Sequence, residues 1–227
     1  MRHKTSRTVI VALLSAVGAV LITVLSAFTV LHFRTASIDD DFSEVFTNEK
    51  HRTPVSVGDV NVITQEVSCG YAVLEMFSAW SGGDITEESL YNEYGRVVTS
   101  TGRSFADEMN RQFPQYDTEI RRYLTNTELI DLVYDQLSEG IPVPFEWAAP
   151  HSGEWTLHYS LVTGMDIEGD SITVANPYGY VEEVHVDDFL KRTRFDAYEN
   201  MPLFLKLGFA FGIFEKNTVF TVSERIG

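Results

Sequence analysis

The sequence predicts an α+β fold, with a helical N-terminal half and an antiparallel sheet in the C-terminal half, behind one N-terminal transmembrane helix. Three observations lead to this prediction. An uncharged apolar run extends from Val9 to Leu31. Segments with helical spacing occupy much of residues 69–140. Short segments rich in β-branched and aromatic residues follow from residue 141 onward.

The composition excludes several classes of protein. The chain has 227 residues, of which 44% are hydrophobic, so it is not disordered as a whole. A formal net charge of −16 argues against a nucleic-acid-binding surface. A single cysteine excludes an intramolecular disulfide and any metal site made of several thiolates.

The apolar run is expected to be an uncleaved signal-anchor over residues 9–33. A helix needs about 20 apolar residues to cross a bilayer, whereas the apolar region of a signal peptide has about 7–15. Basic residues precede the run and Asp39–Asp41 follow it, which predicts that the N-terminus is inside and the domain outside the cell. The alternative is a cleaved secretory signal, because Ala27 and Ala36 are small residues near its end.

The rest of the chain divides into three parts by composition. Residues 1–8 are a short cytoplasmic segment, and residues 34–54 are a polar linker without a sustained period. Residues 55–227 form the domain. No internal repeat interrupts it, so solenoids and propellers are not expected.

Two helices of the first half have clear sequence signals. Residues 69–80 place apolar side chains on one helix face, and a Ser-Gly-Gly sequence ends the helix. Thr125 and Glu128 form a capping box in front of a second amphipathic helix, which ends at Gly140. Weaker signals start two shorter helices, at Asp84 with Glu87 and at Ser104 with Asp107.

The second half is predicted to be a sheet with one brief helix, over residues 186–192. Turn residues separate the expected strands, which are 141–147, 156–167, 171–176, 179–186 and 217–222. The apolar stretch 201–214 is about 14 residues long and contains Lys206, so it is too short to span a membrane. A core or surface-hydrophobic helix is favoured there, and membrane contact is a minor alternative.

Cys69 is the first candidate for chemistry. It is expected at the first position of a helix, where unpaired backbone N–H groups favour an anion, so its thiol pKa is expected to fall. Gly70 leaves space for a substrate, and the amide of Gln65 could donate to an oxyanion. The alternative for a lone cysteine is a small buried hydrophobe.

His158 and Asn176 are the second pair of candidates. His158 lies in one predicted strand, and Asn176 ends the next strand because Pro177 cannot continue it. If the two strands form a hairpin with its turn near residues 167–169, these residues lie side by side, and the amide could orient the imidazole. The alternatives are a structural histidine and a simple Asn-Pro turn. His151 and His185 are rival bases, one in a loop-like stretch and the other before a helix start.

These residues together resemble a known family. Gln65 with Cys69-Gly70, then His158-Tyr159 leading to Gly164, then Asn176-Pro177 resembles the peptidase C39-like group of papain-fold cysteine peptidases. The resemblance covers about residues 54–225. Many members have Asp before the proline, where this chain has Asn176, although papain-like enzymes more widely use Asn. Bacteriocin-processing members are usually fused to a transporter, and this chain has no such segment, so export-coupled leader cleavage is not implied.

The resemblance implies a papain-like fold and a Cys-His-Asn triad. Cys69 would be the nucleophile, His158 the general base and Asn176 its orienting group, and Gln65 with the Cys69 N–H would form the oxyanion hole. We therefore expect a membrane-anchored, extracytoplasmic cysteine peptidase that hydrolyses a peptide or amide bond. Thiol chemistry does not by itself select water over an amine as acceptor. The alternative is a catalytically inactive module that binds peptides or a partner at the cell surface.

Other ligand chemistries have no motif in the chain. It lacks HExxH, P-loop, GxGxxG and EF-hand patterns, so we expect no metal and no cofactor. Asp187-Asp188 fits a helix start better than a metal site. The expected partners are a peptide or protein substrate and the membrane, with no nucleic acid. Substrate specificity, oligomeric state and a propeptide role for residues 35–57 are left open by the sequence.

Overall fold

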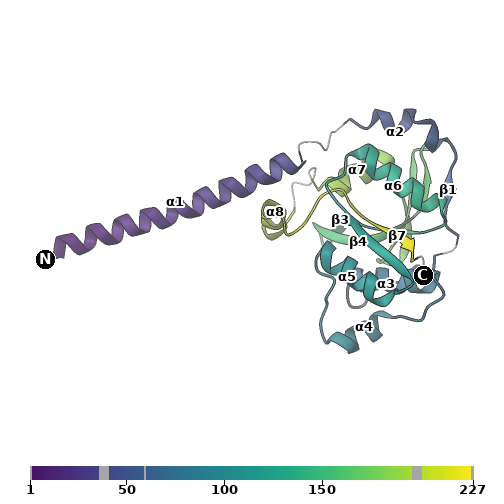
Figure 1. Ribbon diagram of the computed structural model, residues 1–227, viewed down its shortest axis with the longest axis horizontal. Helices are drawn as coiled ribbons and strands as arrows, with labels where there is room; N and C mark the ends of the chain where they lie inside the picture. The colour runs from purple at the N-terminus through teal and green to yellow at the C-terminus, as the bar shows by residue number, and fades with distance from the viewer. Residues whose placement is uncertain (1, 36–40, 59, 196–200, 226–227) are drawn as a thin grey trace.

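The structure is a computed structural model, and it describes residues 2–35, 41–58, 60–195 and 201–225, with the side chains of residues 9–30 in the first helix. Ala36, Asp39 and Asp40, on which parts of the signal and orientation predictions rest, lie outside the described residues. Figure 1 shows one long helix, α1, that projects from a mixed helix and sheet domain.

Helix α1 (Arg2–Thr35) contains the predicted apolar segment. Its residues Val9–Val30 have a mean hydropathy of 2.7, and none of this window is buried in the protein. At 1.5 Å per residue these 22 residues reach about 33 Å, enough to cross a bilayer. A signal sequence would pass the same test, so the choice between an anchor and a cleaved signal stays a prediction.

The described residues of the domain contain seven further α-helices, one 3-10 helix and seven strands. In chain order these elements are α2 (Ser43–Thr47), the 3-10 helix η1 (Glu49–Arg52), β1 (Val55–Ser56), α3 (Cys69–Trp80), α4 (Glu87–Tyr94), α5 (Gly102–Gln112), β2 (Tyr116–Arg121), α6 (Asn126–Ser138), β3 (Val143–His151), β4 (Glu154–Asp166), β5 (Ser171–Asn176), β6 (Tyr180–Val184), α7 (Val186–Arg194), α8 (Leu203–Ala210) and β7 (Thr218–Glu224).

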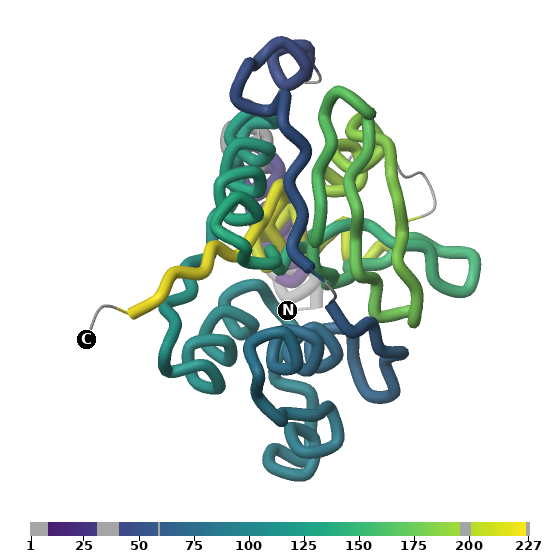
Figure 2. The backbone as a smooth tube through the Cα atoms, turned by 90° about the vertical axis from the view of Figure 1, so that its right-hand side faces the viewer, coloured from purple at the N-terminus to yellow at the C-terminus, as the bar shows by residue number. Residues whose placement is uncertain are grey.

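The strands form one antiparallel sheet in the order β2-β7-β3-β4-β5-β6, and β1 pairs with β4. Figure 2 shows α3, α4 and α5 grouped at the bottom, α6 at the upper left, and the hairpins of β4, β5 and β6 at the upper right. The predicted α+β class, with helices first and an antiparallel sheet afterwards, is confirmed.

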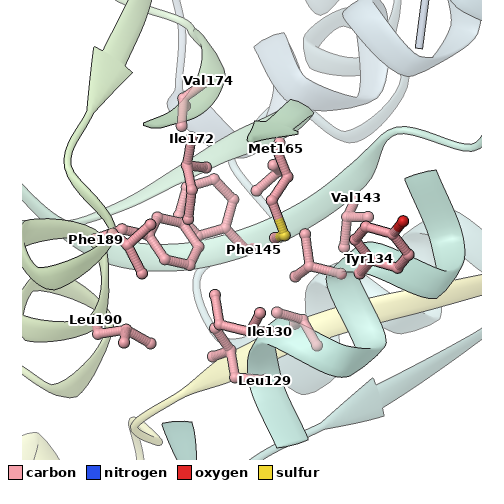
Figure 3. Close-up of a cluster of buried hydrophobic side chains, with 14 of the residues drawn as sticks. Leu129, Ile130, Tyr134, Val143, Phe145, Met165, Ile172, Val174, Phe189 and Leu190 are labelled. Carbon is pink, nitrogen blue, oxygen red and sulfur yellow. The ribbon is translucent and has the colours of Figure 1, made fainter. Parts of the chain in front are cut away.

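Helices cover both faces of the sheet because its strands alternate apolar side chains between them. Tyr159 and Leu161 of β4 face a core that includes α3 and α5. Val162 of β4 faces the opposite core, where Phe145 packs with residues of α6 and α7 such as Phe189. Figure 3 shows this second core, in which side chains from α6, α7 and the sheet converge.

The structure corrects three local predictions. Strand β2 was not predicted; it is an edge strand that pairs with β7, and its alternating charged residues remain partly exposed. Helix α4 begins after Thr86, not at Asp84, because Thr86 and Ser89 form the capping box. Helix α5 begins after Thr101, which pairs with Ser104 in the same way. In both cases the hydroxyl closest to the helix satisfies the first free N–H groups.

Candidate active site

Cys69 is the first residue of α3, as predicted. The side chain of Ser68 caps this helix by accepting a hydrogen bond of 3.2 Å from the N–H of Tyr71. Gly70 has no room for a side chain, since a Cβ there would lie 2.2 Å from the hydroxyl oxygen of Thr99. The start of α3 is therefore packed tightly against the loop that contains Thr99, and Cys69 keeps partial exposure at its end.

A buried carboxylate fixes the loop in front of Cys69. Glu87, at the start of α4, is 5% exposed. Its oxygens accept hydrogen bonds from the N–H of Glu66, at 2.6 Å, and from the N–H of Ser68, at 3.0 Å. Charge-assisted bonds of this kind are about twice as strong as neutral ones. Glu87 therefore sets the path of the chain that leads to Cys69.

Gln65 lies beside the segment that follows Asn176. Its N–H donates to the carbonyl of Pro177 at 2.7 Å, and Thr64 forms an isolated bridge with Tyr178. The side-chain oxygen Oε1 of Gln65 is buried without a hydrogen-bond partner in the described protein. This oxygen can accept a hydrogen bond, whereas a role in an oxyanion hole would require the N–H groups of Nε2.

His158 and Asn176 lie in contact. The Nε2 atom of His158 lies 3.0 Å from the Oδ1 atom of Asn176. Strands β4 and β5 form the predicted hairpin, in which Leu161 pairs with Ala175 and Asp166 with Ser171. Because the ladder stops at Leu161, His158 extends beyond the paired part of the hairpin and reaches Asn176 at its open end.

The contacts of Asn176 determine the tautomer of His158. The N–H of Tyr178 donates to Asn176 Oδ1 at 3.0 Å, and Asn176 Nδ2 donates to the carboxylate of Glu182 at 2.8 Å. These two partners fix the orientation of the amide, since a backbone N–H only donates and a carboxylate accepts. His158 must therefore donate from Nε2 to Oδ1. In the neutral ring, Nδ1 is then left as the unprotonated nitrogen.

A further chain of contacts supports Glu182. Its second oxygen pairs with Arg192 of α7 at 2.7 Å, and Arg192 Nε donates to the carbonyl of Ala148 at 2.8 Å. The guanidinium lies 3.3 Å from the ring centroid of Trp147, which pairs with His158 across β3 and β4. The imidazole is thus connected to α7 through Asn176, Glu182 and Arg192.

Tyr178 interacts both with the imidazole of His158 and with Cys69. Its ring stacks on that of His158, with centroids 4.3 Å apart. Burial raises the pKa of Tyr178 to about 12, and the negative charge of Cys69 contributes in the same direction. The N–H of Tyr159, the residue after His158, forms a hydrogen bond with Cys69 that lowers its pKa. Cys69 therefore lies beside the His158 segment, although no hydrogen bond joins its sulfur to the ring among the described contacts.

The pKa of Cys69 shifts opposite to the expectation. Burial raises it to about 11, and the N–H groups of Tyr159 and Gly70 offset only part of this effect. Burial also lowers the pKa of His158 to about 4, against a smaller opposing contribution from Asn176. Desolvation disfavours the charged form of both groups, and here it outweighs the helix terminus. At neutral pH the site therefore contains a thiol and a neutral imidazole.

A pocket of about 220 Å³ opens beside the sulfur. It is lined by Ser68, Cys69, Gly70, Val97, Thr99, Ser100, Thr156, Leu157, Tyr159, Phe204, Leu205 and Phe214. Most of this lining is apolar, and it joins the start of α3 to β4 and α8. The pocket therefore offers a space for an apolar side chain next to the candidate nucleophile.

Neither rival histidine contacts Asn176 in the described structure, although His151 lies at the edge of the site. His185 is exposed and its Nδ1 lies 3.0 Å from a carboxylate oxygen of Asp170. His151 is exposed at the end of β3, where its ring centroid lies 6.1 Å from that of Tyr178. In the described part of the chain, no group of three or more His, Cys, Asp or Glu side chains could bind a metal ion.

The site is thus a cysteine at a helix start beside a histidine that donates to an asparagine. The Peptidase_C39 like family matches residues 57–202, which include all four of these candidates. The chain belongs to this family of peptidases. The predicted resemblance to C39-like peptidases is confirmed.

One solved structure of similar shape is a crystal structure of a double glycine motif protease from an AMS/PCAT transporter, in complex with the leader peptide. It shares 15% sequence identity with this C39-like chain at a TM-score of 0.48, and the match covers 76% of this chain and 98% of that one. No curated protein matches the chain.

Sequence reasoning missed the residues that support the site. Glu87 was assigned to a helix start, and nothing in the sequence connects its carboxylate to the loop before Cys69. No sequence pattern points to Glu182 or Arg192, because their contact depends on the packing of α7 against the sheet. Tyr178 directly follows Asn176-Pro177, so its place beside the site can be inferred from the order of the chain.

Proposed function

We propose that this member of the C39-like family is a cysteine peptidase that hydrolyses a peptide or amide bond through Cys69, His158 and Asn176. The observation that carries the proposal is the contact of His158 Nε2 with Asn176 Oδ1, at 3.0 Å. It commits one nitrogen to the amide and leaves Nδ1 to take the proton of a nucleophile. Asn176 is then the orienting group of a Cys-His-Asn triad.

The proposed reaction has two halves. The sulfur of Cys69 attacks the substrate carbonyl carbon while its proton passes to His158 Nδ1, and the side-chain amide of Gln65 with the N–H of Cys69 stabilises the oxyanion. The C–N bond then breaks, and His158 returns the proton to the leaving amine. Water, activated by His158, hydrolyses the thioester and releases the acid and the free thiol.

Before the substrate binds, Cys69 and His158 are both neutral in this mechanism. Because the pKa of Cys69 is about 11 and that of His158 about 4, almost all of Cys69 is a thiol at neutral pH before the substrate arrives. Proton transfer therefore accompanies the attack. His158 acts as a general base in this scheme, not as a preformed imidazolium, and it must be neutral for the reaction to start.

We further propose that α1 anchors the enzyme in the membrane, with the N-terminus inside and the peptidase domain on the extracytoplasmic side. The length and hydropathy of Val9–Val30 support the span. The excess of Lys and Arg before it supports the orientation, because positive residues are retained on the cytoplasmic side. Fusing a reporter active only outside the cytoplasm to the C-terminus tests the orientation, which is wrong if the reporter is silent while the chain is membrane-bound.

The experiment that tests the activity compares the full chain with its Cys69→Ala variant. Both are purified in the same detergent and incubated with a diverse peptide mixture, and new peptide termini are identified by mass spectrometry. We expect termini that appear with the wild-type chain and are absent with Cys69→Ala. Identical termini in the two samples, or none in either, contradict the proposal.

A second function is a peptide-binding module without catalysis. It is favoured by the high thiol pKa of Cys69 and by the absence of a described hydrogen bond between its sulfur and His158. In that case peptides bind to the wild-type chain and to Cys69→Ala with equal affinity and are recovered uncut. Binding measured by calorimetry, together with the mass spectrometry above, separates the two functions.

A further inference from the structure

Helix α8 has apolar side chains on two opposite sides. On the inner side, Leu205 and Phe209 are 2% and 3% exposed and pack with Phe195 and Met201. This face attaches the helix to the domain. An ordinary surface helix would have polar residues on its other side.

Apart from Lys206, the outer side of α8 and the turn after it is instead apolar and exposed. Half of the ten exposed large hydrophobic residues described outside α1 occur here, within eleven positions. They are Leu203 at 71%, Phe204 at 65%, Leu207 at 39%, Phe211 at 49% and Ile213 at 55% exposed. A contiguous patch of this kind marks a surface that contacts another apolar phase. We call these five residues the α8 patch.

The transmembrane helix lies next to this patch. Ser26, Ala27 and Val30 of α1 line a cavity of about 230 Å³ together with residues 209–212 at the end of α8. Figure 1 shows α8 beside the domain-proximal end of α1. Ser26 and Val30 belong to the last turns of the apolar window, about 6 Å apart along the helix. If α1 spans a bilayer, α8 lies at the depth of the boundary between acyl chains and headgroups.

The same helix also forms part of the active-site pocket. Phe204 and Leu205 line the pocket that contains Cys69, together with Phe214. Val97, on the other side of this pocket, is 38% exposed. Helix α8 therefore lies next to α1 and also lines the pocket beside Cys69.

We propose that the α8 patch inserts into the membrane leaflet on the domain side, so that the Cys69 pocket opens at the bilayer surface. The substrates are then peptide segments presented at that surface, such as the residues flanking a transmembrane or lipid-attached segment. This inference rests on the proposed anchoring by α1. Insertion of an apolar face by about 5–10 Å is the ordinary behaviour of an interfacial helix.

The insertion can be measured without any activity. The full chain carries Cys69→Ala, which removes its only cysteine, and single cysteines are introduced at Leu207 or Phe211. Each variant is spin-labelled and placed in phosphatidylcholine vesicles. The collision rates of the label with oxygen and with a water-soluble nickel chelate are then compared. Leu21 in α1 is the lipid reference. Phe46 is the aqueous reference, because it is exposed and belongs to α2, a helix that lies beyond the end of α1 in Figure 1.

We expect the labels at Leu207 and Phe211 to show at least about a fivefold higher ratio of oxygen to nickel collisions than the label at Phe46. Values equal to those of Phe46, with Leu21 in lipid, overturn the proposal while the anchor stands. If Leu21 is also in water, the anchor and this proposal both fail. None of these results depends on peptide cleavage, so the proposed peptidase function is tested separately.

Access to the pocket is tested with two alkylating probes. The wild-type chain in vesicles is treated at pH 9 with iodoacetamide or with a phosphatidylethanolamine that carries an iodoacetamide headgroup. We expect the lipid probe, relative to the soluble one, to label Cys69 at least about tenfold more than a cysteine placed at Phe46 in the Cys69→Ala chain. An equal ratio at the two positions shows that the pocket does not face the membrane.

Discussion

The two sides of the active site are built in different ways. On the nucleophile side, which comprises residues 65–69 and Glu87, the chain is fixed by backbone hydrogen bonds to one carboxylate and by a helix cap. On the base side, which comprises His158, Asn176, Glu182 and Arg192, side chains from β4, β5, β6 and α7 contact one another in series. The nucleophile side is therefore held through backbone N–H groups, whereas the base side is held through contacts between side chains.

This difference has a physical consequence. Hydrogen bonds to backbone N–H groups position Cys69 whatever the side chains of the loop are. The orientation of His158 instead requires every link of a chain of polar side chains, and a partly satisfied network of this kind is costly. We expect the base side to be the more sensitive of the two to single substitutions beyond the triad.

The largest effect is expected from the base itself. His158→Ala should lower kcat/KM by about 10³, since general acid–base catalysis contributes about 10²–10⁴. Because His158 must be neutral and its pKa is about 4, the wild-type kcat/KM should fall only below about pH 4. His151→Ala is the matched control and should change kcat/KM less than twofold. A loss in His151→Ala equal to that in His158→Ala would mean that the base has been misassigned.

The second effect concerns the nucleophile. Since burial raises the pKa of Cys69 to about 11, the thiolate fraction grows about tenfold for each pH unit below that value. The rate of alkylation by iodoacetamide should therefore rise about 100-fold between pH 7 and pH 9. Quantitative mass spectrometry of the full chain measures this rate. A rate that is constant above pH 7 would contradict the neutral thiol–imidazole pair.

A smaller effect is expected from the carboxylate on the nucleophile side. Glu87→Gln keeps the shape but replaces one acceptor oxygen by a donor that faces a backbone N–H, so kcat should fall about tenfold with less change in KM. Glu88→Gln, at the exposed neighbouring position, is the control and should behave as wild type. If both variants keep full kcat, the position of Cys69 does not depend on Glu87.

The smallest effect concerns stability. Burial raises the pKa of Glu146, which lies on β3 opposite Tyr159, to about 8. Between about pH 4.5 and 8 the folded protein binds a proton that the unfolded chain has lost, so this residue contributes less stability as the pH rises. From pH 6.5 to 8 the loss is about 1.6 kcal/mol. Glu146→Gln should remove it.

Thermal unfolding of the full chain in detergent at the two pH values measures this contribution. The wild type should lose a few degrees more than Glu146→Gln between pH 6.5 and 8. Equal losses in the two chains would show that Glu146 titrates as an ordinary exposed carboxyl group.

Features that rest on a local sequence pattern could be predicted, whereas most contacts between side chains of different elements could not. The helix that starts at Cys69 and the capping box of Thr125 and Glu128 are local patterns, and both are confirmed. The contact of His158 with Asn176 followed from one hairpin. Strand β2 pairs with β7 from the far end of the chain. The contacts of Glu182 with Asn176 and Arg192 join consecutive elements, but they depend on how β6 and α7 pack, and no sequence pattern specifies them.

The thiol pKa of Cys69 illustrates the limit most clearly. Its place at a helix start is visible in the sequence, and that position alone lowers a thiol pKa. The opposing desolvation comes from the surrounding protein, and its size depends on how β4 and the loop near Thr99 close around the sulfur. A sequence pattern gives the first contribution but not the second, so the sign of the sum could not be predicted.

The most direct test of the central claim is the mass of the enzyme during turnover. The full chain is mixed with a peptide that it cleaves, quenched in acid within milliseconds to seconds, and measured as an intact protein. We predict an added mass equal to that of the N-terminal product less one water, because the acyl group is held as a thioester, which peptide mapping locates on Cys69. Cleavage of that peptide at an unchanged rate by Cys69→Ala, or an acyl group on any other residue, would contradict it.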